Sequence, residues 1–155
     1  MEFKVIQGIV KVEKLDEFLS KYGKKAVFLD ANYIIDENQV YFAVKKAIDS
    51  WKKGRNVAKS LPLEVLLYVA ATRQIKDATK LGIREGINEV VCVLFEKDFK
   101  IENFEEKEVL KIDDEEKIKR ISEFYKIPKE ELNLVGVNKL PLLVRERIIL
   151  FDIEK

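Results

Sequence analysis

Alternating and periodic apolar positions divide the chain into strands and amphipathic helices. Residues 3–12 alternate loosely between apolar and polar, which is typical of a strand, and residues 26–29 form a second, short apolar strand. Residues 90–95 are a continuous, β-branched apolar run that predicts an interior strand. Residues 109–112 are predicted as an edge strand. Together these segments indicate a small sheet.

Between these strands, the first half of the chain has apolar residues at helical spacing. Residues 12–22 carry apolar side chains at helical spacing, and Gly23 suits the position that closes such a helix. A second helix is predicted to begin at Asp36 and to end at Gly54. Its lysines lie on the face opposite the apolar stripe, so we expect that face to be exposed.

The most apolar helix is predicted over residues 61–71. Ser60 can cap it, and Pro62 is tolerated in the first helical turn, where no backbone N–H is needed. Because this segment is apolar on nearly every side, we expect a central helix. Thr72 is expected to cap a separate short helix over residues 73–80.

The distal part of the chain is also predicted to be helical. Residues 113–116 place carboxylates at a helix N-terminus, where the helix dipole favours them. Pro128 opens a short helical turn, and residues 139–150 are predicted as a last helix. The order of elements indicates one α/β or α+β domain over residues 1–155, with several helices packed on a small central sheet.

Composition narrows the class of protein. The chain has 155 residues, of which 47% are hydrophobic, so it can form a substantial core. No apolar run approaches the ~20 residues that cross a bilayer, and no signal-peptide pattern opens the chain. The single cysteine, Cys92, excludes an internal disulfide and suits a buried position. We therefore expect a soluble, cytoplasmic protein without a membrane partner, and the Lys- and Glu-rich composition is seen in proteins from hot environments.

The absence of histidine excludes whole classes of chemistry. Serine–histidine and cysteine–histidine catalysis cannot occur within a chain that has no histidine, and the commonest metal ligand is missing too. Gly82 and Gly86 lack the lysine and the spacing of a phosphate-binding loop. We expect no catalytic residues, no metal and no cofactor.

Charge is distributed unevenly along the chain. The segment from residue 45 to residue 84 holds ten cations and three anions, a balance of +7 within a chain whose net charge is +1. The remainder therefore carries −6, much of it between residues 96 and 116. Such a field attracts polyanions to one region, although two solvated surfaces of opposite sign are the plainer interpretation.

One candidate site is the segment VFLDANYIID, residues 27–36. It resembles the opening strand of PIN-type nucleases, in which an aspartate at a strand end helps to hold Mg²⁺. Asp30 would take that role beside Asn32. A strand and a helix precede this segment, however, and the later acids lie in a run that is typical of a solvated surface. A PIN-like, metal-dependent RNase using Asp30 is our alternative hypothesis.

The second candidate site is the segment AATRQIKDATKLGIREG, residues 70–86, which follows the most apolar helix. If Thr72 caps a helix, the first-turn amides around Arg73, Gln74 and Ile75 face outward and form an anion site. Arg73 adds a forked cation, Gln74 can bind a base edge, and Ile75 offers apolar surface. Lys59 and Arg84 flank the segment in sequence. This pattern favours the end of a nucleic acid, but capping and covering a helix is an equal alternative.

A third feature is the apolar segment near residue 150. Leu150, Phe151 and Ile153 are large apolar side chains that either fold back on the core or dock on another protein.

Residues 58–83, AKSLPLEVLLYVAATRQIKDATKLGI, resemble the small accessory subunit of the KEOPS complex, the TPRKB-like family in its archaeal form. The pieces that carry the resemblance are Lys59-Ser60-Leu61, Glu64-Val65-Leu66-Leu67-Tyr68, Thr72-Arg73-Gln74-Ile75 with Ala78, and Gly82-Ile83. Ala70-Ala71 departs from the pattern, because a small polar residue or glycine is expected there.

The resemblance implies a non-enzymatic subunit of a complex that makes the threonylcarbamoyl modification on tRNA. It implies two partners, the kinase-like ATPase subunit of KEOPS and the 3′ end of tRNA. The residues implied as tRNA contacts are Lys59, Arg73, Gln74, Ile75 and Arg84. The residues expected to dock the ATPase are Leu150, Phe151 and Ile153. A protein-binding regulator that never touches RNA is a third possibility.

Overall fold

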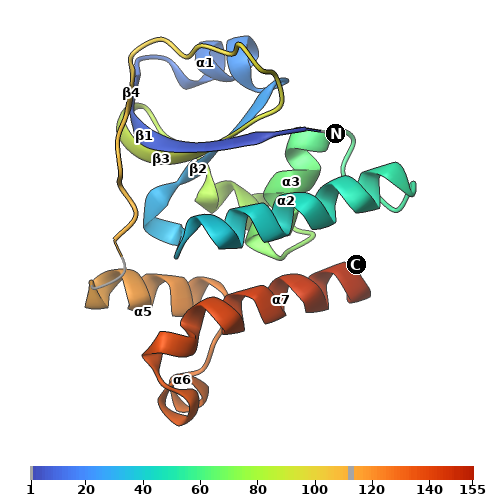
Figure 1. Ribbon diagram of the computed structural model, residues 1–155, viewed down its shortest axis with the longest axis vertical. Coiled ribbons are helices and arrows are strands. Elements are labelled where there is room, and N and C mark those ends of the chain that lie inside the picture. Colours follow the sequence, from blue (N-terminus) through green and yellow to red (C-terminus); the bar gives the residue numbers. More distant parts are fainter. Residues whose placement is uncertain (1, 112–113) are drawn as a thin grey trace.

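A four-stranded antiparallel sheet forms one layer of the molecule. The computed structural model describes residues 2–111 and 114–155 and arranges its strands in the order β2-β3-β1-β4 (Figure 1). The strands are β1 Lys4–Val12, β2 Ala26–Asp30, β3 Gly86–Leu94 and β4 Phe104–Glu106. Every pairing is antiparallel, so the fold is α+β.

The predicted edge strand lies elsewhere in the sequence. The structure forms β4 at Phe104–Glu106 and no strand in the described part of residues 109–112, where residue 112 lies outside the described residues. The N–H groups of Val109 and Leu110 donate instead to the side-chain oxygen of Gln7, at 2.7 and 3.1 Å. The prediction was wrong because a side chain of β1 takes the place of a backbone ladder. A Cβ at Gly8 would come within 2.2 Å of the Glu105 carbonyl oxygen, so glycine permits the close approach of β4.

Helices cover both faces of this sheet. Helix α1, Leu15–Tyr22, lies on one face (Figure 1). There Tyr22 contacts the rings of Phe28 and Phe99, with ring centroids 6.3 and 5.5 Å apart. Helices α2, Glu37–Lys52, and α3, Leu61–Ala70, lie on the other face (Figure 1). This arrangement confirms the predicted helices against a small sheet.

Local sequence signals set the starts of α2 and α3. The Asp36 carboxylate accepts from the Gln39 N–H at 2.7 Å, as the sequence predicts. The Ser60 hydroxyl accepts from the Leu63 N–H at 3.3 Å, and Pro62 occupies the first turn of α3. Helix α3 is buried along most of its length, which confirms the expected central helix.

The distal helices form a further layer beyond α2 (Figure 1). They are α5 Glu115–Phe124, α6 Lys129–Val135 and α7 Leu140–Glu154. Asp114 caps α5, and the predicted contribution of residue 113 lies outside the described residues. Short helical turns complete the chain: α4 Ile75–Ala78 and the 3-10 helices η1 Ala31–Tyr33, η2 Thr79–Leu81 and η3 Val137–Lys139. Within the described ranges, no helix has the length and apolar character needed to cross a membrane.

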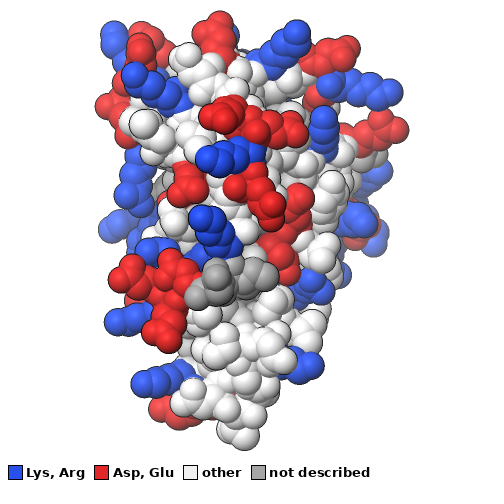
Figure 2. Space-filling model, turned by 60° about the vertical axis from the view of Figure 1, so that its left-hand side comes forward, with Lys and Arg blue, Asp and Glu red and all other residues white. Residues whose placement is uncertain are grey.

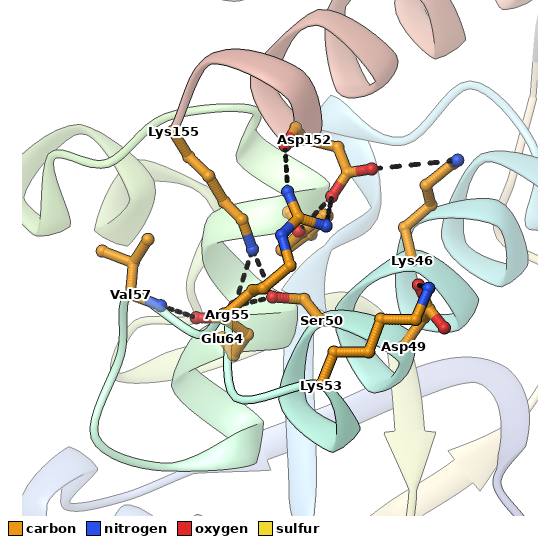
Figure 3. A network of polar contacts seen from close by, with 10 residues as sticks. Lys46, Asp49, Ser50, Lys53, Arg55, Val57, Glu64, Asp152 and Lys155 are labelled. Carbon is orange, nitrogen blue, oxygen red and sulfur yellow. Dashed lines mark hydrogen bonds and ion pairs between the residues drawn. The ribbon is translucent and has the colours of Figure 1, made fainter.

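A buried polar network joins the end of α7 to α2 and α3 (Figure 3). Glu64 is fully buried and accepts from the N–H groups of Val57 and Ala58 at 3.0 and 2.9 Å and from the Ser50 hydroxyl at 3.1 Å. The Lys155 ammonium lies 3.5 Å from the same carboxylate and donates to Ser50. The network therefore fixes the last turn of α7 against the core.

Asp152 is the second carboxylate of this network. It accepts from the Tyr68 hydroxyl, and its carbonyl oxygen accepts from the Arg55 guanidinium at 3.1 Å. Lys46 lies 3.9 Å from its carboxylate (Figure 3). Burial and the bond to Asp152 raise the pKa of the Tyr68 phenol, which keeps it a hydrogen-bond donor.

Candidate functional site: a cavity between α3–α4 and α5–α7

A cavity of about 730 Å³ lies between two walls that are distant in sequence. One wall is the end of α3 with the segment leading into α4, and it includes Arg73 and Gln74. The other wall is the end of α5 together with α7, and it includes Phe124, Lys126 and Phe151. The volume is in the range of small-molecule and nucleotide sites.

The first wall is a turn and not the start of a long helix. Ala71 ends α3 in the left-handed conformation, with φ 54°. The Thr72 hydroxyl then accepts from the Gln74 N–H at 3.1 Å, and α4 begins only at Ile75. The prediction that Thr72 caps a helix over residues 73–80 was therefore wrong. Its hydroxyl serves a local turn, and α4 is too short to offer the expected helix-end anion site.

Arg73 and Gln74 nevertheless stand at the cavity. Both side chains are exposed. Arg73 forms no ion pair or side-chain hydrogen bond with any other described residue, whereas Lys80 on the same wall pairs with Asp77 at 3.8 Å. A guanidinium without an internal partner keeps its five donors for a ligand.

The second wall is held in place by Arg147 of α7. Its guanidinium donates to the carbonyl oxygens of Tyr125 and Lys126, at 3.3 and 3.4 Å, and to the Glu131 carboxylate at 3.0 Å. This fixes the α5–α6 turn beside α7. The sequence pattern did not connect this wall with Arg73, because its α5 part lies about fifty residues further along the chain. Leu150 and Phe151 were predicted, but as docking residues, and the structure places both at the cavity.

The other three predicted tRNA contacts do not line the cavity. Ile75 is 53% exposed on α4. Lys59 precedes α3, so about 15 Å of helix separates it from Ala71. Arg84 precedes β3, where its N–H donates to Asn88 and its carbonyl oxygen accepts from Asn88. The structure brings together Arg73 and Gln74 alone of the five.

Asp30 does not build a metal centre with its neighbours. One oxygen of its carboxylate accepts from both the backbone and the side-chain N–H groups of Asn32, each at 2.9 Å. Lys117, which is buried on α5, contributes a positive charge near Asp30. In the described ranges, no three side chains of the metal-ligating types gather in one place. The alternative hypothesis of a PIN-like nuclease therefore has no support in the structure.

The basic middle of the chain is partly neutralised by internal partners. Lys53 pairs with Asp49 at 3.2 Å, and Lys46 and Arg55 both face Asp152 (Figure 3). The lysines of this region that pair with no other described residue are Lys45, Lys52, Lys59 and Lys76.

Helix α7 presents a second candidate surface, which faces solvent. Leu142, Ile149, Leu150 and Ile153 are all exposed, and Ile153 reaches 70%. Leu142, Ile149 and Ile153 are spaced by seven and four residues, so they lie along one side of the helix. Phe151 differs from the expectation: it is buried, with its ring centroid 4.9 Å from that of Tyr68. Of the three predicted docking residues, Leu150 and Ile153 are accessible, and Leu150 also lines the cavity.

The surface near α6 is also poor in charge. Figure 2 shows mostly uncharged side chains at the lower end of the molecule, where α6 lies. Leu134, Val135 and Val137 are exposed there. This apolar region is near the start of α7 in the chain.

These features define a small α+β protein that offers a cavity and an apolar helix face for binding. The family model of the kinase binding protein CGI-121 matches residues 7–151, so the chain belongs to this family. A curated relative is the KEOPS complex subunit Cgi121 of Pyrococcus abyssi (strain GE5 / Orsay), which is 44% identical over 54 residues. That stretch is 34% of this chain and 32% of the relative, so the match spans about a third of each. The resemblance to the KEOPS small subunit is confirmed.

Proposed function

We propose that this protein is a non-catalytic KEOPS subunit that binds the kinase-like ATPase subunit and recruits tRNA through its 3′ end. The tRNA would then receive its threonylcarbamoyl-adenosine modification from the complex. The family description and the name of the relative support the kinase-like partner. The observation that carries the RNA part is Arg73, which pairs with no other described residue and stands beside Gln74 at an open cavity.

The chemistry of the cavity suits a single-stranded end. Arg73 can hold a phosphate with two parallel hydrogen bonds, and Gln74 can both donate to and accept from a base edge. Phe124 is half-buried at the opposite wall and offers a ring on which a base can stack. A short tail has few phosphates, so we expect modest affinity that falls steeply with salt.

The remaining predicted contacts and two further lysines extend the proposed RNA surface. Lys59, Ile75 and Arg84 lie outside the cavity lining, and we place them along the path of the RNA as it leaves the cavity. Lys45 and Lys52 are exposed and suit non-specific attraction to the adjoining stem. These contacts add affinity without reading sequence.

The solvent face of α7 is the proposed docking surface for the ATPase. Leu150 and Ile153 are its exposed members among the predicted residues, with Leu150 shared between this face and the cavity lining, and Phe151 supports them from the core side. A contiguous apolar helix face is typical of a protein interface. We place this assembly in the cytoplasm.

Charge reversal at Arg73 tests the RNA part. The variant Arg73→Glu should lose tRNA binding while it keeps the melting temperature of the parent, because Arg73 is exposed. Lys24→Glu makes the same charge change between α1 and β2 and should leave binding intact. Trimming the terminal nucleotides of the tRNA should cost the parent as much affinity as Arg73→Glu does. Unchanged binding by folded Arg73→Glu would leave a protein-binding regulator as the better hypothesis.

A further inference from the structure

Two residues of the same cavity have left-handed backbones without being glycine. Ala71 has φ 54° and Lys126 has φ 56°. Both line the cavity, one on each wall. In the described part of the chain, the one other non-glycine residue with positive φ is Asn103, a residue type that adopts this conformation readily.

Both residues close a helix with the same turn. At the end of α5, the Lys126 N–H donates to the Glu123 carbonyl oxygen and the Ile127 N–H donates to Ser122. At the end of α3, the Ala71 N–H donates to Tyr68 and the Thr72 N–H to Leu67. This pair of bonds is the Schellman motif, whose left-handed position is usually glycine. The chain uses glycine at other positive-φ positions, such as Gly136 after α6.

A lysine is an unfavourable choice at such a position. A Cβ in the left-handed region is strained, and glycine would remove the strain at no cost to either turn bond. Residues with strained backbones cluster at active sites and ligand-binding sites. The presence of a lysine at position 126, where glycine would be unstrained, therefore requires an explanation.

Lys126 is also an uncommitted cation. The cavity has five cationic residues, and three of them have internal partners: Lys80 with Asp77, Arg147 with Glu131, and Lys155 with Glu64. Lys126 and Arg73 have no such partner among the residues that the structure describes. They come from opposite walls, so a ligand between them would meet a positive group on each side.

The acids of the cavity favour a nucleotide over a simple anion. Glu123 and Glu154 line it without an ion pair to another described residue, and Asp77 is paired with Lys80. Two free carboxylates repel a phosphate ion but accept hydrogen bonds from the amino groups of unpaired bases. A nucleotide carries both groups, so it can satisfy the cations and the carboxylates together.

We propose that Lys126 is a second phosphate contact of the cavity, facing Arg73 across it, and that its left-handed backbone is retained to hold the ammonium there. This inference rests on the proposed function, because it adds a contact to the same RNA site. It assigns a binding role to the α5–α6 turn, which the sequence pattern had left without one.

Glycine substitutions separate strain from charge. In Lys126→Gly the strain and the charge are both removed, so the melting temperature should rise by about 2–4 °C while tRNA affinity falls. Loss of one single-strand phosphate contact should lower the slope of log affinity against log salt by about 0.7, or about fourfold in affinity at 0.15 M salt. Asn103→Gly changes another residue of positive φ, one that does not line the cavity, without a charge change, and should leave both affinity and slope as in the parent.

A third variant completes the set. Lys126→Gln keeps the strained backbone, so it should lose affinity like Lys126→Gly but keep the parental melting temperature. Full affinity and an unchanged salt slope in folded Lys126→Gly would overturn this inference. If Arg73→Glu still loses binding in the same assay, the proposed function survives that result. If neither variant loses binding, the RNA site itself is wrong.

Discussion

Lys155 offers a sharp test of how the last turn of α7 is held. Its side chain is 3% exposed, and its ammonium lies 3.5 Å from the buried Glu64 carboxylate and 4.7 Å from the centre of the Tyr68 ring. The variant Lys155→Met removes the charge and keeps most of the apolar volume. Methionine also keeps a favourable contact with the tyrosine ring, so the change isolates the ion pair.

The expected cost follows from what Glu64 retains. Breaking a buried ion pair by removing one partner typically costs about 3–5 kcal/mol. Glu64 keeps the N–H groups of Val57 and Ala58 and the Ser50 hydroxyl as donors, so we expect about 3 kcal/mol, at the lower end. That is a large part of the ordinary stability of about 5–15 kcal/mol.

A double-mutant cycle followed by urea denaturation provides the assay. Glu64→Gln keeps an oxygen for the two backbone donors and carries no charge, so Glu64→Gln with Lys155→Met leaves no buried charge unpaired. The double variant should lose less stability than the two single losses combined, by about 1–2 kcal/mol. Additive losses, or a Lys155→Met cost of less than about 1 kcal/mol, would refute the reasoning, because the pair would then behave like an exposed one.

Two further predictions test other parts of the molecule. Ile153→Glu should abolish capture of the kinase-like ATPase subunit by the folded protein, whereas Ile87→Glu, at another exposed isoleucine, should not; equal capture by both would exclude the α7 face. Burial lowers the pKa of Lys117, against the opposing charges of Glu89 and Asp30, so the unfolded state binds the proton more tightly. Lys117→Met should therefore be more stable than the parent at neutral pH, and this gain should vanish as pH rises to about 10.4. A gain that is constant with pH would mean that packing, not charge, is its source.

Elements with strong local signals were predictable from the sequence. The cap residues Asp36 and Ser60 fix the starts of α2 and α3 through bonds within four residues, and the β-branched run of β3 is buried as its composition indicates. The start of α4 was not predictable, because the left-handed backbone of Ala71 redirects the chain before Thr72. A pattern of residue types does not reveal that an alanine has adopted a conformation usual for glycine.

The sequence predicted part of the first wall of the candidate site, but it could not show how the second wall lies opposite. Arg73 and Gln74 were found because cations and amides follow an apolar helix in the sequence. Lys126 was not, because the wall that it occupies is brought opposite Arg73 by tertiary contacts alone. Arg147 makes three contacts from α7 that hold this wall together, and its sequence environment does not distinguish it from an exposed arginine.

The orientation of α7 shows why this part of the structure needs polar contacts. The helix is apolar on both sides: Leu143, Val144 and Ile148 are buried, while Ile149 and Ile153 are exposed. Hydrophobic burial alone therefore discriminates weakly between its rotations about the helix axis. Polar residues discriminate strongly, because a buried charge without a partner is costly. Asp152 and Lys155 find their partners only when the present face is inward, so we infer that they select it and leave the Ile149–Ile153 side free for a partner.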